Sequence, residues 1–130
     1  MQYLEIHKKA IECAENFKKS EIALIEILEI VNREKVYLKM GYTSLFTYCV
    51  EALNLPSNQV YIINGIAKKS QEVPELKQAI SSGKITLSAA RRIVPVISKN
   101  NKEVWLSKAK KLPQLELERE VRAIHPKSMK

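Results

Sequence analysis

The sequence predicts an all-α protein, a compact bundle of about seven helices in a single domain spanning residues 1–130. Apolar residues recur at helical spacing through most of the chain. The chain has only three glycines, is rich in Lys, Glu, Ile and Leu, and contains no convincing strand pattern. Its 130 residues are enough for one hydrophobic core but not for two.

The first 40 residues are expected to form a long helical hairpin. Residues 3–18 are amphipathic, with one apolar stripe through Leu4 and Ile11 and a second stripe beside it. Ser20 can cap a second helix that continues to residue 40 and is closed by Gly41.

The most apolar part of this hairpin is the segment IALIEILEIV, from Ile22 to Val31. A helix that is apolar nearly all round must be covered on more than one side. Two arrangements satisfy this requirement, a central helix of the bundle or a homodimer formed through the segment. The central position is favoured, and the homodimer remains the alternative.

Residues 41–70 are expected to form a helix-turn-helix-like pair, with helices at about 44–53 and 57–70. Thr43 can cap the first helix, Asn54 tolerates the left-handed backbone of a sharp turn, and Ser57 can cap the second. Four apolar residues are expected to meet in the angle between the helices: Leu53, Leu55, Val60 and Ile63.

Residues 74–125 are expected to form the basic C-terminal helices. Pro74 is well placed to start one helix, Thr86 can cap the next, and Pro95 should stop it. Ser98 is expected to open a helix that contains a buried Trp105 and runs to about residue 111. Two further prolines bound the last helix, Pro113 at its start and Pro126 after His125 at its end.

Positive charge is concentrated in the second half of the chain. The formal net charge is +8. Residues 1–65 have seven Lys and Arg against eight Glu, a net charge of −1, whereas residues 66–130 have fifteen against six, a net charge of +9. A basic half that follows a helix-turn-helix-like pair suits a polyanion, because Lys and Arg replace the counterions condensed on phosphates.

The side chains expected to contact DNA lie in the second helix of the pair and in the basic half. Asn58 and Gln59 have the chemistry to pair with adenine edges, and Arg side chains match phosphate geometry. The full set of candidates is Ser57, Asn58, Gln59, Tyr61, Lys68, Lys69, Lys84, Arg91 and Arg92. Ile62 is also expected to face outward, and one of the two arginines could instead pair with Glu72 or Glu75.

No catalytic constellation is visible, so the chain is expected not to be an enzyme and to need no cofactor. His7 and His125 lie near opposite ends of the chain, and no His, Cys and carboxylate group has metal-ligand spacing. No glycine-rich loop could hold phosphates.

The two cysteines, Cys13 and Cys49, fall in helical apolar patterns and are expected to be buried thiols. Such thiols, together with a charged N-terminus and no apolar run of about 20 residues, point to a cytoplasmic protein without a membrane segment.

A run of short motifs supports the DNA interpretation: GYTSLF (residues 41–46), LNLPS (53–57), KKSQEVPEL (68–76), GKITLS (83–88) and ARRIVPV (90–96). In this order they resemble the N-terminal helical domain of bacterial predicted HNH endonucleases. The resemblance covers most of the chain from about residue 20. In that family the nuclease centre lies in a separate C-terminal domain, and this sequence ends before it would start, so the resemblance implies a DNA-targeting module without the nuclease domain. The chain departs from that family at Ile62, Ile63 and Asn64, where arginines are often found, which favours docking on the DNA backbone over base reading.

Two functions from different classes therefore remain. The first is a helical module that docks on duplex DNA mainly through phosphate contacts. The second is a helical adaptor that dimerises or captures a protein partner, suggested by the apolar segment of residues 22–31.

Overall fold

The computed structural model describes residues 2–124, which form an all-α fold without strands. The predicted helix end at His125-Pro126 and the basic tail lie outside the described residues. In chain order the helices are α1 (Gln2–Arg33), α2 (Val36–Lys39), α3 (Leu45–Thr47), a π-helical turn η1 (Tyr48–Ala52), α4 (Ser57–Glu72), α5 (Pro74–Ser81), α6 (Leu87–Ile93), α7 (Lys102–Lys111) and α8 (Gln114–Ile124).

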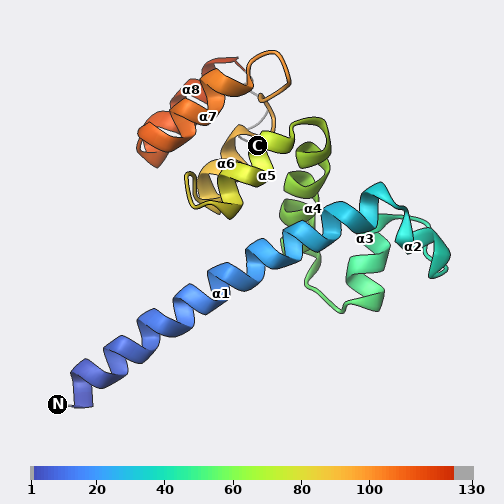
Figure 1. Cartoon of the computed structure of the whole chain (residues 1–130), viewed down its shortest axis with the longest axis horizontal. Coiled ribbons are helices and arrows are strands. Elements are labelled where there is room, and N and C mark those ends of the chain that lie inside the picture. The colour runs from blue at the N-terminus through green and yellow to red at the C-terminus, as the bar shows by residue number, and fades with distance from the viewer. Residues whose placement is uncertain (1, 125–130) are drawn as a thin grey trace.

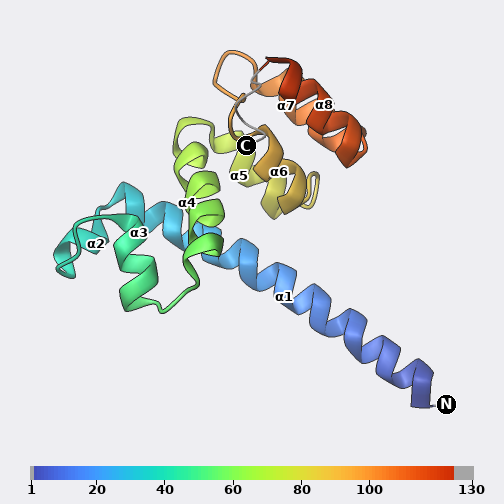
Figure 2. The ribbon, with the colours of Figure 1, turned by 180° about the vertical axis from the view of Figure 1, so that it is seen from behind.

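The predicted hairpin over residues 1–40 is wrong, because α1 is one continuous helix of 32 residues. Its first part, residues 2–20, projects away from the rest of the protein (Figures 1 and 2), and every residue in it is exposed. We call residues 2–20 the arm and residues 21–124 the body.

Ser20 does not interrupt α1, because a capping residue starts a helix only where the preceding helix has already ended. Residues 2–33 contain neither Gly nor Pro, so nothing ends the helix before that point. The chain turns instead at Lys35, which adopts a left-handed backbone with φ 54°. Gly41, with φ 92°, then closes the short α2, as the sequence predicted for the end of this region.

α4 is the central helix of the body, since α1, α3, α5 and α6 all contact it (Figure 1). The apolar segment of residues 22–31 packs on α4 and α5 through Ile25, Leu28 and Val31. This segment is therefore covered within one chain on that face, whereas Ile27 on the opposite face is 52% exposed.

The C-terminal helices α5–α8 follow most of the predicted signals. Pro74 occupies the first turn of α5, and the hydroxyl of Thr86 accepts a hydrogen bond from the Ala89 amide at the start of α6. α6 ends before Pro95, and Trp105 is buried. The predicted start at Ser98 is wrong: its amide donates to Oδ1 of Asn101 at 2.7 Å in a turn, and α7 begins only at Lys102.

Among the described residues, no helix combines the length and the apolar content needed to cross a membrane.

Candidate nucleic-acid interface

The turn between η1 and α4 has the predicted sharp geometry. Asn54 is left-handed, with φ 58°, and the Leu55 amide donates to the Cys49 carbonyl at 3.1 Å. The first helix of the pair is more irregular than expected, because α3 passes directly into the π-helical turn. Its cap is Ser44, whose hydroxyl accepts from the Thr47 amide, and not the predicted Thr43.

The predicted side chains in the angle between the two helices are confirmed except for Leu53, and Leu55 is partly buried against the core. Val60 and Ile63 are buried there as expected, but Leu53 is 38% exposed. Cys49 and Asn64 are buried instead, with 3.6 Å between the sulfur and Oδ1 of Asn64. Burial and a weak hydrogen bond between small side chains are not visible in a pattern of large apolar residues, which is why the sequence interpretation missed them.

One face of the first two turns of α4 is open to solvent. The predicted contacts there are all exposed: Ser57, Asn58, Gln59 and Tyr61. Ser57 is not the cap, since Pro56 occupies that position and offers no side-chain hydrogen bond. Ile62 is half-buried against the core, so its predicted outward position is wrong.

The predicted basic contacts divide into unpaired and paired side chains. Lys68, Lys84 and Arg91 are exposed and make no ion pair with another described residue. Lys69 lies 3.4 Å from Glu72, and Arg92 lies 2.7 Å from Glu118. Arg92 thus pairs across α6 and α8, not with Glu72 or Glu75, because α8 packs directly against α6.

Two basic residues that the sequence interpretation missed lie close to Lys84. A hollow of about 570 Å³ between α5 and α7 is lined by Lys84, Lys110 and Lys111. Glu75 borders the same hollow, and the hydrogen bond from Lys102 at 2.7 Å holds the pKa of the Glu75 carboxyl below its ordinary value. The signal that could have found these lysines is the run KAKK at the end of α7.

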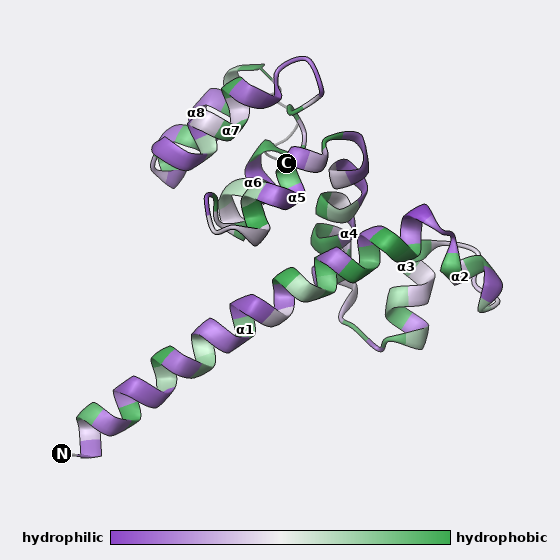
Figure 3. Ribbon diagram, viewed as in Figure 1, coloured by the Kyte–Doolittle hydropathy of each residue, from purple (hydrophilic) through white to green (hydrophobic). Residues whose placement is uncertain are grey.

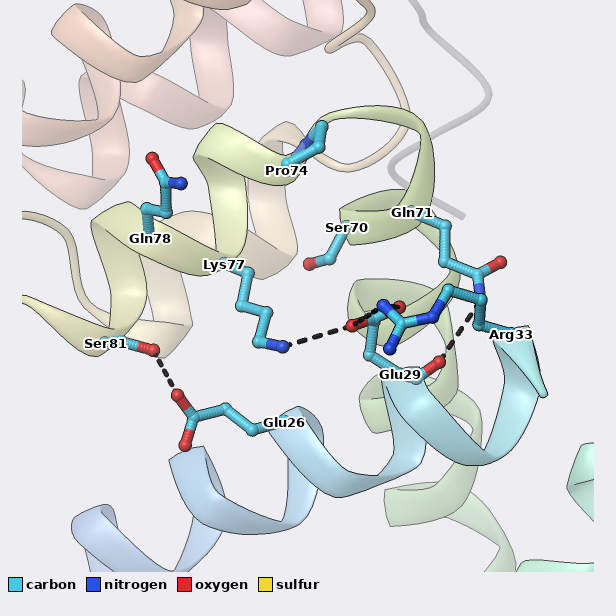
Figure 4. A pocket seen from close by; sticks show the side chains of 9 residues that line it. All are labelled: Glu26, Glu29, Arg33, Ser70, Gln71, Pro74, Lys77, Gln78 and Ser81. Carbon is cyan, nitrogen blue, oxygen red and sulfur yellow. Dashed lines mark hydrogen bonds and ion pairs between the residues drawn. The ribbon is translucent and has the colours of Figure 1, made fainter. Parts of the chain in front are cut away.

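A second hollow, of about 430 Å³, separates α1 from α5 and is shown in Figure 4. The buried carboxylate of Glu29 lies 3.0 Å from Arg33 and 3.1 Å from Lys77. The Ser81 hydroxyl donates to Glu26 at 2.7 Å, and the side-chain amide of Gln71 donates to the backbone carbonyl of Glu29 at 3.2 Å. Glu29 pairs with both cations that line this hollow, and Glu26 accepts from the Ser81 hydroxyl, so these contacts fasten α1 to α4 and α5. The two carboxylates of the lining balance its two cations in number.

The two thiols differ in environment: Cys13 is exposed on the arm, contrary to its predicted burial, and Cys49 is buried as predicted. Burial raises the pKa of the Cys49 thiol above its ordinary value, and the Asn64 contact offsets this only in part.

We expect a thiol-specific disulfide reagent to modify one thiol per chain in the native protein. That thiol should be Cys13, because it is exposed and the reagent can reach it. Cys49 should react only after unfolding, since its raised pKa and its burial both suppress attack. Counting released thiolate with and without denaturant measures this, and Cys13→Ser should abolish the fast phase. Rapid modification of two thiols in the native protein would contradict the buried position of Cys49.

Within residues 2–124, no group of three or more His, Cys, Asp or Glu residues is arranged to hold a metal ion. This chain matches no protein-family model, no curated protein and no solved structure.

Proposed function

We propose that this chain is a non-catalytic module that docks on duplex DNA, mainly through phosphate contacts. The observation that carries the proposal is the open N-terminal end of α4, where four polar side chains stand exposed after a sharp left-handed turn. In helix-turn-helix proteins this end of the second helix enters the major groove. The positive end of the helix dipole also favours an approaching phosphate.

The charges of the described residues support phosphate contact beyond α4. Lys68 lies ten residues after Asn58, about 15 Å along the helix axis, so that one helix can present groups to separate phosphates. Arg91 adds a guanidinium from α6, and Lys84 adds an ammonium from the loop before it. These three side chains keep their charge available for DNA because no described carboxylate pairs with them.

Base reading is a smaller part of the proposal. Asn58 and Gln59 can each pair with an adenine edge in the major groove. However, Oδ1 of Asn58 already accepts the Gln59 amide at 2.9 Å, so Asn58 must turn away from its own helix to reach a base. We therefore expect weak sequence preference. The resemblance to HNH endonuclease N-terminal domains fits a docking role and stays a prediction.

The proposal predicts binding that weakens steeply with salt. Each Lys or Arg contact to a phosphate releases about 0.9 counterions, so contacts by Lys68, Lys84 and Arg91 give a log–log slope of about −3. Fluorescence anisotropy of a labelled duplex, titrated with this protein from about 50 to 300 mM salt, measures the slope. The absence of binding at the lowest salt, or affinity that does not change with salt, would overturn the proposal.

A further inference from the structure

The arm of α1 carries an apolar stripe that no described part of the chain covers. Tyr3 is 85% exposed, Ile6 64% and Phe17 57%. The stripe continues along α1 through Leu24, which is partly buried against the core, to Ile27, which is 52% exposed. Figure 3 shows apolar residues along the whole projecting helix. An apolar stripe that extends from Tyr3 to Ile27 and is exposed over most of its length marks an interaction site.

We propose that this stripe is the seam of an antiparallel, two-stranded coiled coil between two copies of this chain. Its eight residues are spaced alternately three and four apart, and we call them the seam: Tyr3, Ile6, Ala10, Cys13, Phe17, Ser20, Leu24 and Ile27. This is a seven-residue repeat, the period that keeps one stripe facing a partner helix over its whole length. The inference goes beyond DNA docking and does not depend on it.

A competing stripe on the same helix is less suited to pairing. Leu4 and Ile11 are also exposed and seven residues apart. The next position in that series is Lys18, and Ile25 after it is already buried in the body. The seam, by contrast, contains no charged residue in eight positions.

The polar face of the arm favours a second copy over an acidic membrane surface or DNA. Residues 2–20 contain four Lys and three Glu. Glu15 precedes Lys19 by four residues, and Glu5 precedes Lys9 by four, the spacing at which opposite charges stabilise a helix. A helix that binds anionic lipid needs a predominantly basic polar face, which the arm lacks.

The order of side-chain sizes along the seam fits its own reverse. We align the two antiparallel helices so that residue 15 of one copy lies opposite residue 15 of the other. Each seam residue then faces the seam residue whose number adds to its own to give 30. At each end of the seam two large side chains face each other, Tyr3 with Ile27 and Ile6 with Leu24. Nearer the centre two small side chains face each other, Ala10 with Ser20, and at the centre the small Cys13 faces the aromatic ring of Phe17. A two-fold symmetric interface requires this kind of self-complementarity.

Charge and area agree with the antiparallel arrangement. It separates the two bodies, each of which has sixteen Lys and Arg against eleven Glu, whereas a parallel pair would bring both bodies to the same end. The seam spans about 36 Å at roughly 1.5 Å per residue. At roughly 200 Å² for each aromatic side chain, the exposed parts of Tyr3 and Phe17 alone offer about 280 Å². Six further positions bring the area toward the roughly 800 Å² per partner of a standard interface.

Light scattering after gel filtration, from about 1 to 200 µM chain, tests the pairing. The mass should rise from 14.9 kDa toward twice that value as the concentration increases. Ile6→Glu with Phe17→Glu should keep the chain monomeric. Leu4→Glu with Ile11→Glu is the matched control, since it also places two acidic groups at exposed apolar positions, and it should dimerise as the original chain does. An unchanged fluorescence spectrum of the buried Trp105 confirms that the body of each variant is folded.

Oxidative cross-linking tests the orientation. In an antiparallel pair Cys13 faces Phe17 of the second copy, so the original chain should cross-link poorly under a copper-phenanthroline oxidant. Ala10→Cys with Ser20→Cys, in a Cys13→Ser background, should give a covalent dimer, because the two introduced thiols face each other within disulfide reach. The proposal is overturned by a monomer throughout the concentration range, by equal effects of the two glutamate pairs, or by efficient cross-linking through Cys13, which a parallel pair would give.

Discussion

Replacing Lys68 and Arg91 together by alanine is expected to weaken binding to duplex DNA about 60-fold at about 0.1 M salt and to reduce the log–log salt slope by about two. Each phosphate contact contributes about 0.9 to the slope, which is roughly eightfold in affinity at 0.1 M salt relative to 1 M. Both side chains are exposed, and neither pairs with another described residue, so their removal should leave the fold intact. Anisotropy titrations of the variant and the original chain at several salt concentrations measure both effects.

The matched control removes two positive charges elsewhere. Lys8→Ala with Lys19→Ala lowers the net charge by the same two units, but on the polar face of the arm. If the local basic surface matters, this control should bind DNA within about threefold of the original chain, a difference that long-range steering alone can produce. Equal losses in the two variants would mean that only the net charge counts, and the docking surface proposed here would then be wrong.

Arg92 is deliberately left out of this variant. Its guanidinium lies 2.7 Å from Glu118 and is only 27% exposed. Changing it would break the link between α6 and α8, and a loss of DNA binding could then follow from a loosened fold. The sequence placed Arg91 and Arg92 together as equivalent contacts; only the packing of α8 against α6 distinguishes them.

The elements predicted well are those bounded by residues with a local backbone effect. Pro74 and Pro95 fix where helices begin and end because proline lacks an amide donor, and Asn54 and Gly41 accept left-handed conformations that other residues avoid. Ser20 failed as a boundary because a hydroxyl makes a helix start possible without ending the helix before it. The missed exposure of the arm has a related cause, since helical periodicity identifies an apolar face but not what covers it.

The surroundings of the candidate DNA-contacting residues were predicted in part, because local sequence patterns indicate exposure but not long-range contacts. Polar residues in the first turns of α4 are exposed, as their position in the pattern suggested. Ion pairs between residues far apart in the sequence could not be predicted from sequence patterns. Lys102 pairs with Glu75, and Lys77 with Glu29, only because helices distant in the chain pack together. The same packing brings Lys110 and Lys111 beside Lys84.

Replacing Glu29 by glutamine is expected to lower the free energy of unfolding by about 2 kcal/mol. The Glu29 side chain is only 6% exposed and faces two cations, Arg33 and Lys77 (Figure 4). Neutralising it leaves Lys77 without its carboxylate partner, and among the described residues Arg33 keeps only the exposed Glu34. The loss is smaller than the roughly 3–5 kcal/mol of a fully buried pair, because Arg33 is 55% exposed and can return to water. Urea unfolding followed by Trp105 fluorescence measures the change.

Glu34 supplies the matched control for Glu29. It pairs with the same Arg33, at 3.6 Å, but its side chain is 60% exposed. Glu34→Gln should therefore cost less than about 0.5 kcal/mol, as is usual for surface ion pairs. If the two glutamines cost the same, burial contributes nothing to the Glu29 contact, and α1 is held to the body by its other contacts, chiefly the apolar packing of Ile25 and Leu28. If Glu29→Gln is the costlier, adding Lys77→Met to it should cost less than the two single losses combined, because methionine removes the unpaired cation and keeps its apolar stem.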